Sequence, residues 1–401
     1  MPLNVRFAGL WVEILSRSSN RVGWIKPSAI RRMLEYSAGM ENLVHFEQGE
    51  PDFITPHHIV EAAVKAARNG FTHYTEVEGT LELRQAIAEK VKNENCIDAD
   101  AKTEVTVTSG SQEAMLITAL GFLDRGDEVL ILDPYYPAYF EDTLIAEATP
   151  VAVRLYEGGK YGVELDVLEK KITEKTKMIW MSNPCNPTGH VFSKRDLENI
   201  AEVAQEHNLI VFADEIYEKL TYDGVKNISI GSLPGVEDRT ITVNGFSKAY
   251  AMTGWRIGYI VAEKKLSATL RKLHYYAALC PNSISQKAAV AALSGPQDCV
   301  QEMLREYSRR RRLMMDELNL IESLPYTVPN GAFYVFPDFS AFEKSDEALA
   351  LRLLKEDGVV TVPGSGFGAT GEGHLRISYS ISYEQIQEGM KRLRTCLRRK
   401  A

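Results

Sequence analysis

The sequence predicts an α/β fold in which a mostly parallel sheet is covered by helices, with a smaller α+β region beside it. From about residue 57 to residue 295, short apolar runs alternate with helical stretches, as they do in a parallel sheet with helices on both faces. Polar or glycine-rich clusters follow several of these apolar runs. After residue 295 the pattern changes to a long charged stretch and shorter mixed segments, which predict a separate α+β layer.

Residues 1–55 are predicted to be irregular, because glycines and prolines interrupt them. Two amphipathic stretches, 57–70 and 81–95, then predict helices, and the first ends at the stop signal Asn69-Gly70. The next segments predict strands at 105–108, 128–132, 178–182, 209–214, 240–244 and 256–262, and helices at 111–123 and 196–208. Beyond residue 295 we predict helices at about 298–319 and 346–357 and at the C-terminus, with strand-like runs at 359–363 and 374–380.

Composition narrows the class of protein. The 401 residues are 45% hydrophobic and 25% charged, which is ordinary for a globular protein and excludes a disordered chain, a collagen and a polytopic membrane protein. The net charge of −8 argues against a general nucleic-acid binder. The N-terminus lacks a convincing signal-peptide core, and the apolar runs are shorter than the roughly 18–20 residues that span a bilayer. We therefore expect a cytoplasmic protein with no membrane partner.

Cysteine and histidine give no sign of a metal or disulfide framework. The five cysteines are scattered and form no C-x-x-C, and the eight histidines form no H-E-x-x-H. We expect reduced thiols and no protein-bound metal.

Two loops after predicted strands have the composition of ligand-binding turns. In VTVTSGSQEA the strand ends at Ser109-Gly110 and a helix begins at Ser111; free N–H groups at a helix start can bind an anion. An ordinary strand–turn–helix connection would look the same. In SNPCNPTGH two Asn-Pro pairs make a rigid polar loop, where Asn186 can either bind a ligand oxygen or stabilise the turn.

Three further clusters contain charged groups in apolar surroundings. Asp214 ends the apolar run LIVFAD, and a buried carboxylate is costly without a cationic partner; it could instead cap a helix. Lys248, in TVNGFSKAYAMTGWRIGY, has small and apolar neighbours, where a lysine readily loses its proton and acts as a nucleophile. Arg376 lies in the strand-like run HLRIS, and its fork suits a carboxylate, either from a ligand or from a structural ion pair.

Two other motifs are interpreted as non-functional. VVTVPGSGFGATG resembles a dinucleotide loop, but a strand-like segment follows it where a helix is needed. A nicotinamide enzyme is therefore disfavoured. The run Arg309–Arg312 has acidic neighbours and predicts a solvated, ion-paired helix face rather than a nucleic-acid patch.

Together these clusters resemble the class I/II pyridoxal-phosphate (PLP) aminotransferases of fold type I. The likeness covers nearly the whole chain, from SNRVGWIKPSAI through QGEPDFITP and THYTEVEGTLELRQAIA to GHLRISYS, and GFSKAYAMTGWRIG matches the family's signature around its Schiff-base lysine. The sequence is most similar to the subgroup of bacterial and archaeal aspartate and aromatic aminotransferases. The resemblance implies a seven-stranded type of sheet, a large PLP-binding domain at 60–295, and a small domain built from 1–59 and 296–401.

The resemblance also implies a role for each motif residue. Lys248 would hold PLP as a Schiff base and move the substrate proton, and Asp214 would pair with the pyridine nitrogen. Asn186 and Tyr217 would bind the phenolic oxygen, and Tyr136 would stack on the ring. Arg376 would bind the substrate α-carboxylate, assisted by the backbone of Gly49. The residues implied around the phosphate are Gly110, Ser111, Gln112, Ser247 and Arg256, with Tyr74 contributed by the second subunit of a homodimer.

Departures from the family pattern concern specificity. Gln112 stands where one branch that acts on acidic substrates has lysine, and Ile30 stands where that branch has threonine. We expect a less acidic side-chain pocket that tolerates aromatic groups. Gly245 replaces a hydroxyl present in some branches, and Ser247 is expected to compensate for it.

The predicted function is transfer of an amino group from an L-amino acid, of aspartate or aromatic type, to a 2-oxo acid such as 2-oxoglutarate in a ping-pong cycle. The alternative on the same scaffold is β-elimination or another lyase reaction, which Lys248 and Arg376 would also serve. A PLP-binding transcription regulator is disfavoured, because residues 1–55 are too short for a DNA-binding module and show no helix-turn-helix pattern. A purely structural protein would leave all five site motifs unrelated.

Overall fold

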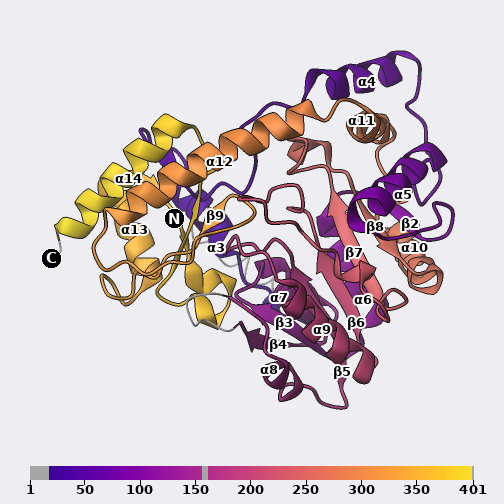
Figure 1. The fold of residues 1–401 in the computed structure, drawn as a ribbon, viewed down its shortest axis with the longest axis horizontal. Coiled ribbons are helices and arrows are strands. Elements are labelled where there is room, and N and C mark those ends of the chain that lie inside the picture. The colour runs from indigo at the N-terminus through magenta and orange to yellow at the C-terminus, as the bar shows by residue number, and fades with distance from the viewer. Residues whose placement is uncertain (1–17, 156–160, 400–401) are drawn as a thin grey trace, which may run out of the picture.

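The structure is a computed structural model of the chain and describes residues 18–155 and 161–399. Its centre is a seven-stranded sheet (Figure 1) with the strand order β2-β8-β7-β6-β5-β3-β4. The strands are β2 (Val105–Thr108), β3 (Glu128–Asp133), β4 (Thr149–Arg154), β5 (Thr176–Ser182), β6 (Ile210–Asp214), β7 (Thr240–Gly245) and β8 (Gly258–Ala262). All neighbouring strands are parallel except β8, which runs antiparallel to both β2 and β7. The predicted mostly parallel α/β sheet is confirmed.

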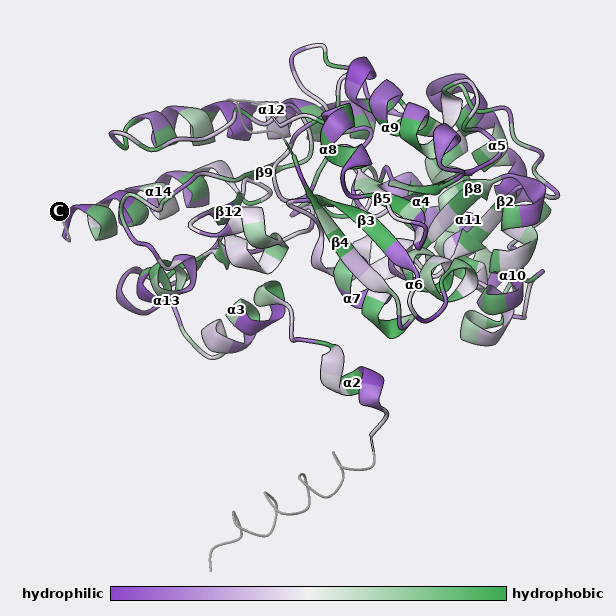
Figure 2. Cartoon of the chain, turned by 90° about the horizontal axis from the view of Figure 1, so that it is seen from below, coloured by the Kyte–Doolittle hydropathy of each residue, from purple (hydrophilic) through white to green (hydrophobic). Residues whose placement is uncertain are grey.

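Helices cover both faces of this sheet because its strands are apolar on both sides. One face packs against α6 (Ser111–Phe122), α7 (Pro137–Ile145) and α10 (Lys264–Ala278), and the other against α8 (Leu165–Glu169) and α9 (Lys194–Glu206) (Figure 2). Consecutive residues of one strand divide between these layers: Trp180 joins the first core, whereas Ile179 and Met181 join the second. The β2 edge carries α4 (His57–Arg68), α5 (Leu81–Asn95) and α11 (Ser283–Ser294).

The remaining elements form a second group, to which segments near both ends of the described chain contribute. It contains α2 (Asn20–Trp24), α3 (Ala29–Ser37), β1 (Val44–His45), α12 (Asp298–Asn319), β9 (Tyr334–Val335), α13 (Asp346–Asp357), β10 (Val359–Val360), β11 (Val362–Pro363), β12 (Leu375–Ser378) and α14 (Tyr383–Arg398). Strand β1 pairs with β10, although 315 residues separate Val44 from its partner Val359 (359 − 44). The long helix α12 runs from beside α11 toward α14 (Figure 1). The boundaries between a large and a small domain, predicted at residues 59/60 and 295/296, stay a prediction.

Several details differ from the sequence-based expectation. The described part of 1–55 is not irregular, because α3 begins after Ser28, whose side chain accepts a hydrogen bond from the Arg31 N–H. Strand β4 was not predicted. The strand expected at 256–262 begins only at Gly258. As expected, the glycine-rich run near 364–371 leads into a strand, β12.

The arginine run on α12 is ion-paired but not fully solvated. Arg310 and Arg311 are both 5% exposed. Arg310 donates to Asp52 (2.8 Å) and Glu306 (2.9 Å), and Arg311 lies 2.8 Å from Asp223. The predicted solvated face is therefore wrong for these two residues, because Asp52 and Asp223 reach them from distant segments. Among the described residues, no helix is long and apolar enough to cross a membrane.

Candidate active site

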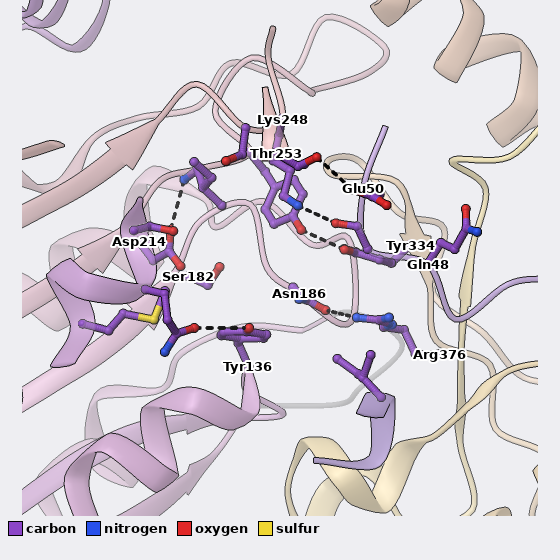
Figure 3. Close-up of a pocket in the computed structure, with 18 of the residues that line it drawn as sticks. Gln48, Glu50, Tyr136, Ser182, Asn186, Asp214, Lys248, Thr253, Tyr334 and Arg376 are labelled. Carbon is purple, nitrogen blue, oxygen red and sulfur yellow. Dashed lines mark hydrogen bonds between the residues drawn. The ribbon is translucent and has the colours of Figure 1, made fainter. Parts of the chain in front are cut away.

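A cavity of about 430 Å³ lies at the carboxyl ends of the parallel strands (Figure 3), between the sheet and the second group of elements. This is where an open parallel sheet binds ligands. Most of the residues predicted for the site line it: Gly49, Ser111, Gln112, Tyr136, Asn186, Asp214, Tyr217, Ser247, Lys248, Arg256 and Arg376.

Lys248 lies just beyond the end of β7 and points into the cavity. Its Nζ donates a hydrogen bond to the carbonyl oxygen of Gly49 and lies 5.9 Å from the ring centre of Tyr217 and 6.0 Å from that of Phe333. Burial lowers the pKa of Lys248 to about 8, because the charged amine has lost water. A lysine of this kind is partly neutral near neutral pH and can act as a nucleophile or base.

Asp214 ends β6 and is 4% exposed. Its carboxylate accepts hydrogen bonds from the Tyr139 hydroxyl (2.8 Å) and the Ile216 N–H (3.2 Å). Burial raises the pKa of Asp214 to about 6. No cation donates a hydrogen bond to this carboxylate among the described residues, so it is suited to a cationic ligand group.

The β2–α6 turn forms a small cradle at one end of the cavity. Gly110 has φ +85°, and a Cβ added there would lie 2.7 Å from Nη2 of Arg256. Only glycine therefore lets the guanidinium lie against the start of α6. Arg256 is held by a 2.9 Å bond to the carbonyl oxygen of Thr253, and Ser111 and Ser247 complete the polar lining. Free N–H groups, hydroxyls and a guanidinium are the donors that a phosphate group takes.

Arg376 lies on β12 at the opposite side of the cavity and is 1% exposed. It donates to the Asn186 side-chain oxygen (3.2 Å) and to the Glu47 carbonyl (2.5 Å), while its guanidinium lies 4.5 Å from the Tyr334 ring centre. Its Nε is buried and has no partner among the described atoms. An unpaired buried donor of this kind is suited to an anionic ligand group.

Tyrosines line the remaining walls. The Tyr217 and Tyr334 hydroxyls are 2.8 Å apart and hydrogen-bonded. Burial raises the pKa of both groups, so both stay protonated near neutral pH. Tyr136 opens α7 and lies 3.5 Å from the Gln112 side chain.

Two predicted residues do not line the cavity. Gly110 lies behind the cavity wall and contributes by having no side chain, which leaves room for the Arg256 guanidinium. Tyr74 is 84% exposed and belongs to the loop at 72–80, away from the cavity of its own chain. Its predicted role requires a second subunit.

The sequence analysis did not find several residues that the structure places in or next to the site. Tyr139 contacts Asp214, Tyr334 packs under Arg376, and Thr253 donates to Glu50 (2.8 Å). Spacing could have indicated Tyr139, because residues three apart, such as Tyr136 and Tyr139, are neighbours on a helix, but no helix was predicted here. Tyr334 and Glu50 gave no such signal, because their position depends on the packing of distant segments.

Comparison with known proteins agrees with this geometry. The family described as "Aminotransferase class I and II" matches residues 41–393. The chain is 44% identical over 384 residues to an aromatic-amino-acid aminotransferase from Thermococcus litoralis, and also to an aspartate aminotransferase from Pyrococcus abyssi. Each alignment covers 95% of this chain and 98% of the relative.

A solved structure has the same fold. The aromatic aminotransferase from Pyrococcus horikoshii superposes with a TM-score of 0.87 at 43% identity, covering 92% of this chain and 99% of that one. These matches extend across both the sheet and the second group of elements. The chain therefore belongs to the class I and II aminotransferases, a family of PLP-dependent enzymes.

Proposed function

We propose that this aminotransferase moves the amino group of an L-amino acid, of aspartate or aromatic type, to a 2-oxo acid such as 2-oxoglutarate in two half-reactions. The main support for this proposal is the position of Lys248. Its amine lies in one cavity with the Asp214 carboxylate and the Arg376 guanidinium. The lyase alternative is not favoured, because the relatives compared above are aminotransferases by name.

The residues present are suited to PLP. We assign the phosphate to the cradle of Gly110, Ser111, Gln112, Ser247 and Arg256, where glycine leaves the room that a Cβ would fill. We assign the ring to the space between Tyr136 and Asp214. When bound, PLP supplies an electron sink that allows a proton to leave the Cα of an amino acid.

This chain's own groups would hold and move the protons. Asp214, with its carboxylate oriented by Tyr139, would keep a proton on the pyridine nitrogen. Asn186 and Tyr217 would donate to the phenolic oxygen. The Nζ of Lys248 would hold the cofactor and then take and return the substrate proton as a general base, which its lowered pKa of about 8 supports.

Arg376 would orient the substrate by its α-carboxylate. Asn186 and the Glu47 carbonyl already position two of its nitrogens, which leaves donors of the guanidinium for a bidentate contact. Gly49 keeps this region open, because a Cβ there would lie 3.0 Å from the Tyr334 hydroxyl.

The substrate side chain would meet an apolar wall. Ile30 and Leu34, on α3, line the cavity. Among the described residues, its only cationic side chains are Lys248, Arg256 and Arg376, each already assigned. A second carboxylate would therefore have no dedicated cation from this chain, which supports a preference for aromatic over acidic side chains.

We also propose a homodimer with shared sites. Tyr74 is exposed, and so is Tyr276 on α10 (86%); exposed aromatic groups are typical of subunit contacts. In this arrangement Tyr74 would reach the phosphate of the partner's cofactor.

A panel of amino donors with 2-oxoglutarate tests the proposal. We expect kcat/KM for tyrosine and phenylalanine to exceed that for aspartate by about tenfold, which is about 1.4 kcal/mol. Lys248→Ala serves as the blank, and Lys265→Ala, a lysine on α10 away from the cavity, is the matched control. A preference for aspartate as the donor would contradict the proposal that the substrate side chain meets an apolar wall. Turnover at the wild-type rate in Lys248→Ala would contradict the assignment of the base.

A further inference from the structure

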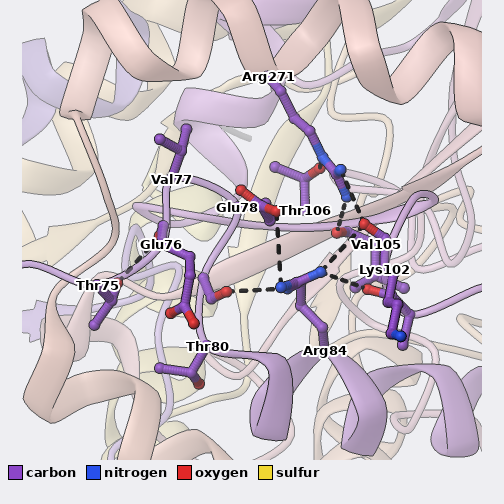
Figure 4. A network of polar contacts seen from close by, with 12 residues as sticks. Thr75, Glu76, Val77, Glu78, Thr80, Arg84, Lys102, Val105, Thr106 and Arg271 are labelled. Atoms are coloured by element: carbon purple, nitrogen blue, oxygen red, sulfur yellow. Dashed lines mark hydrogen bonds and ion pairs between the residues drawn. The ribbon is translucent and has the colours of Figure 1, made fainter.

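The loop at 72–80, which carries Tyr74, is held by side chains from two helices, α11 and α5. Gln286 of α11 is fully buried, accepts from the Thr80 N–H (2.7 Å) and donates to the Thr75 hydroxyl (3.0 Å). Arg84 of α5 donates to the Gly79 carbonyl (3.0 Å) (Figure 4). The exposed Tyr74 thus projects from a base that has little freedom to move.

The same loop rests on β2. The Val107 N–H donates to the Glu78 carbonyl (2.9 Å). Gly79 has φ +92°, and a Cβ there would lie 2.6 Å from the Val107 side chain. Arg271 of α10 donates to the Thr106 hydroxyl (2.9 Å) and so fixes the same strand (Figure 4). Strand β2 leads directly into the phosphate cradle.

One histidine connects this loop to the cradle itself. His274 of α10 is fully buried. Its Nε2 lies 2.8 Å from the Val77 carbonyl oxygen and its Nδ1 lies 2.6 Å from Glu113 Oε1. Glu113 is in the first turn of α6, and its other oxygen accepts the Ser109 N–H at 2.6 Å. A continuous path therefore runs from the Tyr74 loop to the turn before Gly110.

Each ring nitrogen of His274 has a hydrogen-bond partner, one on the loop at 72–80 and one in the first turn of α6. Glu113 in turn uses its two oxygens on two different elements, α10 and the turn before Gly110. The pair therefore joins the loop that carries Tyr74 to the turn that leads into the phosphate cradle.

We propose that His274 and Glu113 are positioning residues that couple the phosphate cradle of one subunit to the loop carrying Tyr74 into the partner's site. The inference rests on the proposed function, namely on the cradle and on the dimer. Neither residue lines the cavity. Loss of the pair would loosen the cradle in its own subunit and also misplace Tyr74 in the neighbouring site.

The first test measures how fast the holoenzyme loses PLP absorbance after dilution. We expect about tenfold faster loss in His274→Ala and Glu113→Ala, which is about 1.4 kcal/mol. Glu113→Gln should stay within about threefold of wild type. Its amide can accept from Ser109 and donate to a neutral His274, which keeps all three bonds. His274→Gln, which can make only one of the two contacts, should lie between these extremes.

Lys272→Gln, an exposed position on the same helix, is the matched control, and Tm is measured for each variant. Equal PLP retention in wild type, His274→Ala and His274→Gln would overturn the inference. So would a fall in Tm without faster PLP loss, which is the result for a purely structural pair. If Lys248→Ala turns over amino donors at the wild-type rate, the proposed function fails instead.

A hybrid dimer tests the coupling between sites. One subunit carries Lys248→Ala with His274→Ala, so the site that retains its lysine belongs to the wild-type subunit but receives Tyr74 from the variant. We expect PLP loss from that site to be at least threefold faster than in a hybrid carrying Lys248→Ala alone. Equal rates would overturn the coupling. A chain that sediments as a monomer would overturn the dimer on which it rests.

Discussion

Asp214 and Glu215 are consecutive carboxylates at the end of β6, and both are buried. Burial raises the pKa of Asp214 to about 6 and that of Glu215 to about 8. Asp214 lines the cavity, whereas Glu215 faces away from it, accepting from the Ser229 hydroxyl (2.7 Å) and the Asn95 amide (3.3 Å). The comparison teaches that a raised pKa marks burial, and that a functional site also needs a cavity and an unfilled partner position.

The largest expected effect comes from replacing the cavity-facing carboxylate. Asp214→Asn should lower kcat by roughly 100- to 1,000-fold, because losing one partner of a buried charge pair costs about 3–5 kcal/mol. Glu215→Gln is the matched control and should stay within about threefold of wild type. Similar losses in the two variants, measured under the same saturating PLP and substrate, would remove the distinction between the two carboxylates.

A smaller effect is expected from the neighbour that orients Asp214. Tyr139→Phe keeps the ring, which packs 5.6 Å from Trp180, but removes the hydrogen bond that lowers the pKa of Asp214. We expect kcat to fall by about tenfold. The carboxylate should also protonate more easily, so the acid limb of the pH–rate profile should move to higher pH. Tyr135→Phe is the control, and an unmoved acid limb in Tyr139→Phe would argue that the hydroxyl only fills space.

The smallest effect on activity, but a clear one on stability, is expected at Glu215. Its folded-state pKa of about 8 exceeds the ordinary value of about 4.3. The folded state therefore holds a proton that the unfolded state releases. The contribution of Glu215 to the free energy of unfolding is therefore fully present below its unfolded-state pKa of about 4.3. It is lost as pH rises toward 8.

Glu215→Gln does not titrate, so its free energy of unfolding relative to wild type should rise by about 1.4 kcal/mol per pH unit within this window. Denaturant unfolding at pH 6 and pH 8 measures the difference. Glu202→Gln, an exposed acid on α9, should show no such trend. A pH-independent difference at Glu215 would mean that its carboxylate is ionised in the fold.

The core of the fold could be predicted because its physical cause is local. A parallel strand covered on both faces must be apolar along its covered part, as residues 178–181 of β5 and 210–213 of β6 are. Strand β4 was missed because it lies at the sheet edge, carries Pro150 and is only partly buried. The helix α3 was missed because prolines and glycines flank it, although its Ser28 cap was visible in the sequence.

The site was predictable only in part, for a related reason. Lys248, Asp214 and Arg376 are conspicuous, because charged groups in apolar runs need a partner. Tyr334 bonds to Tyr217, 117 residues away, and Arg310 bonds to Asp52, 258 residues away, and no local sequence pattern indicates contacts over such separations. The roles of the site residues and the domain boundaries remain predictions that the experiments above address.

The single reversed strand has a consequence for how this enzyme could be altered. Because β8 runs antiparallel to β7, Lys248, which follows β7, and Arg256, which precedes β8, lie on one connection between neighbouring strands. The backbone spacing between the two residues is thus set within one short connection, whereas their charged ends also depend on outside partners: Lys248 on the Gly49 carbonyl and Arg256 on the space beside Gly110. In engineering, an exchange of residues 246–257 between relatives would therefore have to bring these two partner positions with it.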